Sequence, residues 1–198
     1  MFVDYKVIPN FFQNPDFIRE LALAQYYRDS SNEEGFVAHS KKFPGRRTDN
    51  LYTILDQETY SSIMREFYSR LLFGSIRKDI NLNYNINGFP VFHSLFKNDD
   101  GLGYSGYHRD STIYAAVVYL NNAPDDGEYG TTVYIPNAST GVEKPFTFPY
   151  QYNTCVMYRG EFLHGAENAF GNTIETSRLS MNFFISDLDF SIRSPTLA

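Results

Sequence analysis

The chain of 198 residues has a single cysteine and no tryptophan. One cysteine, Cys155, excludes an internal disulfide framework and any zinc site built from paired cysteines. The chain also lacks an apolar run approaching the roughly 18 residues of a membrane-spanning helix. Its first residues include charges and a proline where a signal peptide needs an apolar centre. From these absences we expect no membrane association and a reducing, cytoplasmic location.

Positive charge is also scarce, because 17 Lys and Arg stand against 23 Asp and Glu, giving a net charge of −6. Nucleic-acid binding depends on neutralising phosphates, so we expect no nucleic acid as a partner. The short basic cluster Lys41, Lys42, Arg46 and Arg47 is typical of a solvated loop. Within it, Phe43-Pro-Gly-Arg-Arg-Thr48 is basic and aromatic, so this loop is kept as a candidate for facing a substrate.

Aromatic residues are abundant instead, with 18 Phe and 16 Tyr. Such residues favour strands, and from about residue 80 onward short strand-like runs alternate with turns rich in Gly, Asn, Asp and Pro. The predicted strands are 81–86, 90–97, 112–120, 130–135, 154–158, 165–168 and 178–186. This spacing predicts an antiparallel sandwich or barrel. Tracts 99–107 and 137–152 are predicted to be loops beside the mouth of a site.

Two helices are predicted before the strands. Asn14 is suited to cap a helix that begins at Pro15 and ends near Tyr27. A second apolar stripe of helical spacing covers Asp56 to Phe73, and Gly74 follows as a stop. We interpret both stripes as core faces that pack on a sheet. The expected organisation is one domain over 1–198, with helices and support strands in 1–80 and the β core in 81–190.

The pattern that carries chemistry is His108-Arg109-Asp110, followed far downstream by His164 and then by Arg178. In a strand, residues i and i+2 share a face, so His108 and Asp110 can bind one ion together. Two imidazoles and one carboxylate are the ligand set of non-haem Fe(II) sites that keep open positions. Arginine offers bidentate hydrogen bonds to a carboxylate. The competing interpretation is that His108 and His164 are ordinary hydrogen-bonding histidines.

The remaining histidines are not predicted to bind metal. His39 is interpreted as an exposed loop residue. His93 is interpreted as a core or surface histidine, and the sequence leaves open whether it lines the pocket. Four apolar residues near the motifs, Val117, Val118, Met157 and Met181, are interpreted as plain core, because alternation places half of each strand inside a sandwich.

The ordered motifs of residues 90–186 resemble the Fe(II)/2-oxoglutarate-dependent dioxygenases, especially their prolyl-4-hydroxylase-like branch. They are Tyr104–Asp110, Val118–Asn121, Gly127–Thr132, Leu163–Gly165 and Arg178. The resemblance implies a mainly β fold with flanking helices, a double-stranded β-helix or jelly roll buttressed by two or more N-terminal helices. It also implies iron ligands, and residues that bind the distal carboxylate of 2-oxoglutarate. The ligands would be His108, Asp110 and His164, and the carboxylate would meet Arg178 and Tyr119.

The activity implied by this resemblance is hydroxylation of a protein side chain, such as a prolyl residue, or of a small metabolite, with O2 consumed and succinate and CO2 released. The chain departs from the family pattern in the wide gap between His164 and Arg178 and in having Phe96 where relatives often have tyrosine. Two alternatives remain open: a non-catalytic jelly-roll module that binds a peptide or sugar, and a cupin-type metalloenzyme that ignores 2-oxoglutarate. The sequence does not indicate an oligomeric state.

Overall fold

The computed structural model describes residues 3–29, 45–76, 80–81, 88–99, 106–186 and 191–192. The strands are β1 (Tyr5–Ile8), β2 (Arg28–Asp29), β3 (Arg46–Arg47), β4 (Ile80–Asn81), β5 (Gly88–Leu95), β6 (Tyr114–Tyr119), β7 (Thr131–Pro136), β8 (Glu143–Phe148), β9 (Cys155–Arg159), β10 (His164–Ala166), β11 (Arg178–Ile185) and β12 (Ser191–Ile192). The helices are α1 (Pro15–Leu23), α2 (Leu51–Ile54), α3 (Gln57–Phe73) and a 3-10 turn at Ile174–Thr176.

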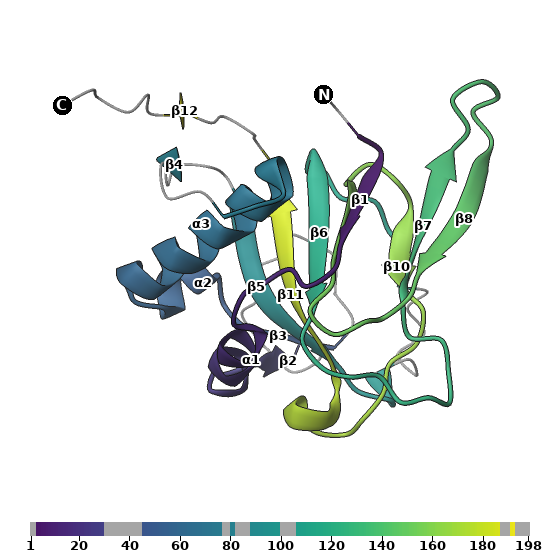
Figure 1. Ribbon diagram of the computed structural model, residues 1–198. Coiled ribbons are helices and arrows are strands. Elements are labelled where there is room, and N and C mark those ends of the chain that lie inside the picture. Colours follow the sequence, from purple (N-terminus) through teal and green to yellow (C-terminus); the bar gives the residue numbers. More distant parts are fainter. Residues whose placement is uncertain are drawn as a thin grey trace.

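The strands form two facing sheets and a separate pair (Figure 1). The large sheet has the order β1-β9-β6-β11-β5-β3-β2, the small sheet the order β10-β7-β8, and β12 pairs with β4. Every pairing between these strands is antiparallel. The prediction of a mainly β, antiparallel fold is therefore confirmed.

Both predicted helices are present; the first begins after its predicted cap Asn14, and the second begins after Asp56, which also caps it. The Asn14 side chain accepts a hydrogen bond from the Phe17 backbone N–H at 3.3 Å, and Asp56 accepts one from the Thr59 N–H at 2.9 Å. Gly74 ends α3 in the left-handed conformation, with φ 70°. Helix α1 ends at Leu23, earlier than predicted, and the short helix α2 was not predicted.

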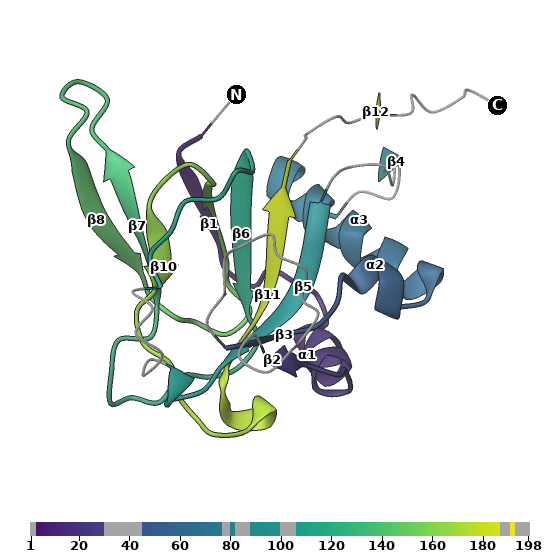
Figure 2. The same cartoon turned by 180° about the vertical axis from the view of Figure 1, so that it is seen from behind.

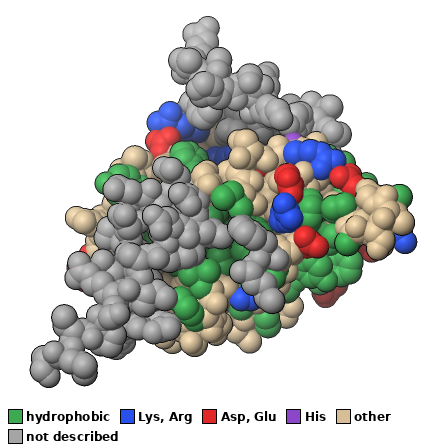
Figure 3. All heavy atoms as spheres, turned by 90° about the horizontal axis from the view of Figure 1, so that it is seen from above, with side chains coloured by type: hydrophobic (Ala, Val, Ile, Leu, Met, Phe, Trp, Pro, Cys, Tyr) green, Lys and Arg blue, Asp and Glu red, His purple; other side chains and the backbone are tan. Residues whose placement is uncertain are grey.

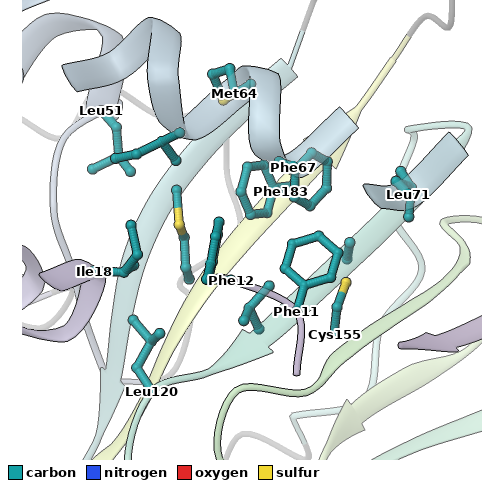
Figure 4. Close-up of a cluster of buried hydrophobic side chains, with 14 of the residues drawn as sticks. Phe11, Phe12, Ile18, Leu51, Met64, Phe67, Leu71, Leu120, Cys155 and Phe183 are labelled. Atoms are coloured by element: carbon teal, nitrogen blue, oxygen red, sulfur yellow. The ribbon is translucent and has the colours of Figure 1, made fainter. Parts of the chain in front are cut away.

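The helices cover one face of the large sheet, and the small sheet lies on the other side (Figures 1 and 2). Between helices and sheet, Phe67 of α3 stacks on Phe183 of β11 with ring centroids 3.5 Å apart. Figure 4 shows this pair at the centre of a buried cluster. Its other labelled members are Phe11, Phe12, Ile18, Leu51, Met64, Leu71, Leu120 and Cys155.

Side chains alternate between the two faces of the large sheet, so a second core lies on the face opposite the helices. The helix-covered face carries Ala116, Val118, Met157, Met181 and Phe183. The face toward the small sheet carries Ala115, Val117, Tyr119, Val156 and Tyr158, which pack with residues of β7 and β8. The interpretation as plain core is therefore confirmed for Val118, Met157 and Met181. Val117 belongs to the second core and in addition lines a cavity between the sheets.

Several predictions of local structure need correction. The tract 137–152 is not only a loop, because it contains β8, which pairs with β7 along its whole length. The predicted loop 43–48 contains β3, which pairs with β5 and with β2. Of the predicted strand 81–86, residues 82–86 lie outside the described residues, as do His39, Lys41, Lys42 and most of the tract 99–107. Strand β1 was not predicted.

No described helix combines the length and the apolar character needed to cross a membrane. Among the described side chains of the face seen from above, basic and acidic groups lie next to one another (Figure 3).

Candidate metal centre

His108 and His164 meet across an isolated antiparallel β-bridge. Each backbone N–H donates to the carbonyl oxygen of the other residue at 2.9 Å. This pairing joins the segment before β6 to the start of β10, and it places the two imidazole rings with their centroids 4.5 Å apart. The pairing therefore brings His108 and His164, which are far apart in the sequence, close together in space.

The Nδ1 atom of each imidazole ring is hydrogen-bonded to a backbone carbonyl group. His108 Nδ1 lies 2.8 Å from the Gly106 carbonyl oxygen, and His164 Nδ1 lies 2.8 Å from the Phe162 carbonyl oxygen. A carbonyl oxygen only accepts hydrogen bonds, so both Nδ1 atoms carry the proton and donate it. Both Nε2 atoms of the neutral rings therefore present lone pairs, which is the form in which histidine binds metal.

Asp110 completes the group. One carboxylate oxygen lies 3.5 Å from His108 Nε2 and the other 3.5 Å from His164 Nε2. The three ligand atoms lie within 4.8 Å of one another. Arg109, between the ligands in sequence, points away and binds Glu143 at the surface.

This arrangement fits a cation. Three lone-pair donors face a common point, and Asp110 Oδ2, which is buried there, has no hydrogen-bond partner among the described residues. An unsatisfied buried carboxylate oxygen is costly unless an ion or a donor reaches it. The set of two imidazoles and one carboxylate suits Fe(II), and it leaves other coordination positions open.

The directions of the pKa shifts of His108 and Asp110 agree with roles as metal ligands. Burial and the neighbouring His164 lower the pKa of His108 from its ordinary value, which favours the neutral ring. For Asp110, burial opposes ionisation, but interaction with His164 and His108 outweighs it and lowers the pKa. Because a metal binds neutral imidazole and ionised carboxylate, both directions favour metal binding over proton binding near neutral pH.

Arg178, the first residue of β11, lines the same cavity as the three ligands. Its side chain is buried, with 3% of the residue exposed. The guanidinium donates to the carbonyl oxygens of Tyr129 and Gly130, each at 3.2 Å, and to Thr131 Oγ1 at 3.1 Å. All three acceptors are neutral, and no described carboxylate forms an ion pair with this arginine.

Tyr119 lies next to Arg178 but does not line the cavity. Its hydroxyl donates to Thr131 Oγ1 at 2.7 Å, and its ring lies 5.6 Å from the guanidinium carbon of Arg178. Thr131, which does line the cavity, therefore receives hydrogen bonds from both residues. A direct contact of Tyr119 with a bound carboxylate stays a prediction.

Polar residues of the cavity that the sequence did not single out include Thr131, Tyr158 and Asn182. Arg47, which also lines the cavity, comes from the segment 43–48 that was kept as a candidate for facing a substrate. His93 is a buried histidine, as interpreted, with a ring nitrogen 3.4 Å from the Asn182 amide; it also lines the cavity, the possibility that the sequence left open. Tyr158 packs against the His164 ring with centroids 4.6 Å apart. In the sequence, only its position two residues after the buried Val156 indicates that both side chains point to the same face of the sheet.

Comparisons with known proteins identify the fold. No protein-family model matches the sequence, and no curated protein is significantly similar to it. Among solved structures, an oxidoreductase of the 2OG-Fe(II) oxygenase family from Burkholderia pseudomallei aligns with a TM-score of 0.58 and 15% identity, over 96% of this chain and 87% of that one. The fold of this protein is therefore the jelly roll of the 2-oxoglutarate/Fe(II) oxygenases.

Two further structures of this class resemble the chain. A prolyl hydroxylase from Trichoplax adhaerens, in complex with a peptide fragment of hypoxia inducible factor, has a TM-score of 0.54 and 12% identity, over 93% of this chain and 84% of that one. HygX from Streptomyces hygroscopicus, with nickel and 2-oxoglutarate bound, has a TM-score of 0.51 and 12% identity, over 91% and 81%. The resemblance to this superfamily, first indicated by the sequence motifs, is thus confirmed at the level of the fold.

Proposed function

We propose that this protein is an Fe(II)- and 2-oxoglutarate-dependent oxygenase, with His108, Asp110 and His164 as iron ligands and Arg178 as the residue that binds the distal carboxylate of 2-oxoglutarate. Tyr119 supports this contact through Thr131. When bound, iron and 2-oxoglutarate supply the oxidising chemistry, which consumes O2 and releases succinate and CO2. The expected reaction is hydroxylation of a small metabolite or of a protein side chain such as a prolyl residue.

The observation that carries the proposal is the buried cation at Arg178. A buried arginine is normally paired with an acidic group, because desolvating an unpaired charge is expensive. The described contacts of Arg178 are carbonyl and hydroxyl oxygens, which orient the guanidinium without neutralising it. A carboxylate entering the shared cavity would supply the missing charge and accept two parallel hydrogen bonds.

The other residues prepare the cavity for the metal and the co-substrate. The Gly106 and Phe162 carbonyl groups fix the orientation and the protonation of the two histidine rings before any ion arrives. The large sheet supplies an apolar wall through Ala115 and Val117, which excludes water and strengthens electrostatic interactions inside.

We also propose that residues 1–198 form one domain. In it, the helices and support strands of residues 1–80 buttress the jelly-roll core of residues 81–190. The cluster that joins α1 and α3 to the large sheet supports this division of roles.

Anaerobic isothermal titration calorimetry tests the proposal. We expect one equivalent of Fe(II) to bind the metal-free protein, and one equivalent of 2-oxoglutarate to bind only after the metal. Binding of Fe(II) without 2-oxoglutarate would favour the cupin-type metalloenzyme, and binding of neither would favour a non-catalytic module. Working without O2 keeps the measurement independent of an unknown substrate.

A further inference from the structure

Tyr158 of strand β9 is a buried tyrosine that lines the cavity between the sheets, which we call the metal cavity because the three proposed ligands line it. Only 3% of the residue is exposed, and its side chain belongs to the core on the face toward the small sheet. Its ring packs against the ring of the proposed ligand His164, with centroids 4.6 Å apart. Tyr158 therefore lies at the end of the cavity that holds the proposed metal ligands.

The hydroxyl of Tyr158 has no hydrogen-bond partner within the described part of the chain. Two other tyrosines that pack in the same core differ in this respect. The Tyr119 hydroxyl donates to Thr131 Oγ1 and the Tyr150 hydroxyl donates to the Leu179 carbonyl oxygen, each at 2.7 Å. A buried hydroxyl without a partner is costly and needs a physical reason. Because Tyr158 lines a cavity, a molecule bound there would supply the missing acceptor.

The strand register leaves space beside this hydroxyl and separates it from Arg178. On β6, Ala115 lies opposite Tyr158, and on β11 Phe184 lies opposite Ala115. Ala115 lines the cavity, and its single methyl group keeps this level of the sheet open. Arg178 lies six residues before Phe184 on the same strand, which corresponds to about 20 Å of backbone. Tyr158 and Arg178 therefore approach the cavity from its two ends.

Resting on the function proposed above, we propose that the Tyr158 hydroxyl donates a hydrogen bond to the carboxylate of 2-oxoglutarate at the metal end of the cavity, opposite the carboxylate that binds Arg178. 2-Oxoglutarate carries a carboxylate at each end, and both need hydrogen-bond donors in a cavity with an apolar wall. Arg178 supplies the donors at one end, and Tyr158 supplies a hydroxyl without a partner at the other. Tyr158 is then a further co-substrate-binding residue.

The charges around Tyr158 favour this contact. Burial raises the pKa of the phenol well above its ordinary value, and the Asp110 carboxylate raises it further, against smaller opposing effects of Arg178 and Arg47. The hydroxyl is therefore protonated at neutral pH and acts as a donor, rather than as a second anion beside Asp110. A hydrogen bond from a neutral donor to a carboxylate is among the stronger hydrogen bonds in proteins.

The ring and the hydroxyl of Tyr158 have separable roles. The ring packs against His164 and within the core that includes Val156 and Phe148, and a phenylalanine keeps this packing. The hydroxyl is the only group that Tyr158→Phe removes. This variant therefore distinguishes a hydrogen bond to the co-substrate from mechanical support of the ligand His164.

Anaerobic isothermal titration calorimetry of the Fe(II)-loaded protein with 2-oxoglutarate tests this inference. We expect Tyr158→Phe to raise the Kd of 2-oxoglutarate about tenfold, because a hydrogen bond to a charged group is lost, while the Kd of Fe(II) for the metal-free protein changes less than about twofold. Tyr5→Phe is the matched control and should change neither Kd, since Tyr5 lies opposite Tyr158 on β1 but is 43% exposed.

The visible charge-transfer band of the complex, measured without O2 at saturating 2-oxoglutarate, locates the hydrogen bond. A donor at the metal end withdraws electron density from the carboxylate that binds iron. Tyr158→Phe should therefore shift the band maximum. Arg178→Lys, which alters the opposite end of the cavity, should leave the maximum in place.

The outcomes separate this inference from the proposed function. An unchanged Kd of 2-oxoglutarate in Tyr158→Phe overturns the inference and leaves the oxygenase proposal standing. A raised Kd without a band shift places the hydroxyl at the distal carboxylate, and a parallel loss of Fe(II) affinity shows that Tyr158 only supports His164; either result also overturns it. If the unaltered protein binds neither Fe(II) nor 2-oxoglutarate, the proposed function fails as well.

Discussion

His108 and His164 exchange backbone hydrogen bonds at 2.9 Å in both directions, although they belong to segments far apart in the sequence. This bridge directs both Nε2 atoms at the carboxylate of Asp110. The candidate metal centre is therefore built on paired backbone rather than on free loops, so the proposed ligands are already oriented for an ion.

Asp110→Ala should abolish tight Fe(II) binding, because it removes the one anionic ligand and leaves two neutral imidazoles. Anaerobic calorimetry of the metal-free variant measures this directly. Asp126→Ala is the matched control, since Asp126 is exposed in a turn and its side chain accepts from Tyr129. Unchanged Fe(II) affinity in Asp110→Ala would remove Asp110 from the ligand set.

Arg178→Lys should raise the Kd of 2-oxoglutarate about 10- to 100-fold while leaving Fe(II) affinity unchanged. A lysine keeps the charge but loses the paired hydrogen bonds, each of which contributes about 1.5–3 kcal/mol when a charged group is involved. Calorimetry on the Fe(II)-loaded variant measures the change, and Arg65→Lys serves as control. Circular dichroism verifies the fold, because Arg178 also binds the Tyr129 and Gly130 carbonyl groups. An unchanged Kd would contradict the role of Arg178.

Tyr158→Phe should not lower the free energy of unfolding, and should raise it by up to about 1 kcal/mol. The residue is 3% exposed, and its hydroxyl forms no hydrogen bond within the described part of the chain, so no bond is lost. Tyr119→Phe is the contrasting variant, because its hydroxyl donates to Thr131 at 2.7 Å; it should lose about 1 kcal/mol. Urea denaturation of the metal-free proteins compares them. A larger loss in Tyr158→Phe than in Tyr119→Phe would show that the account of the cavity is wrong.

Phe67→Ala should lower the free energy of unfolding by about 3–5 kcal/mol. The ring is fully buried and stacks on Phe183, so its loss opens a cavity where α3 meets the sheet. Phe17→Ala, at a residue of α1 that is 45% exposed, should cost far less. Equal losses in the two variants, measured by denaturation in urea, would contradict this packing.

The pH dependence of stability should include a contribution from Asp56. The Thr59 backbone N–H lowers the pKa of this carboxyl from 3.8. Since the folded pKa lies below the unfolded one, the stabilisation is present above the unfolded pKa and is lost as the pH falls through the folded pKa. Asp56→Asn keeps a good helix cap but does not titrate. Denaturation at neutral and acid pH should show the unaltered protein losing more stability than Asp56→Asn; parallel losses would exclude this contribution.

The features predicted correctly from the sequence are those with local causes. The helix start at Pro15 follows from the capping side chain of Asn14, and the end of α3 follows from Gly74. His108 and Asp110 share a site because of a spacing of two residues, which any strand-like backbone brings together.

The features that were missed depend on distant pairing or lack a pattern. Strand β8 is mostly exposed and begins with Glu-Lys-Pro, so only its last three residues alternate apolar and polar side chains. Strand β3 has two residues and exists because β5 and β2 flank it. Arg47 lies opposite His93 through that pairing; its segment was a candidate from composition, but no local motif encodes the pairing that brings it to the cavity.

The most direct test of the central claim is an anaerobic titration of the metal-free protein with Fe(II) and then 2-oxoglutarate, followed by visible absorption. The account predicts a charge-transfer band that appears only when both are present and that is absent in His108→Ala. A protein that binds neither, or a band that persists unchanged in His108→Ala, would contradict the assignment of this site.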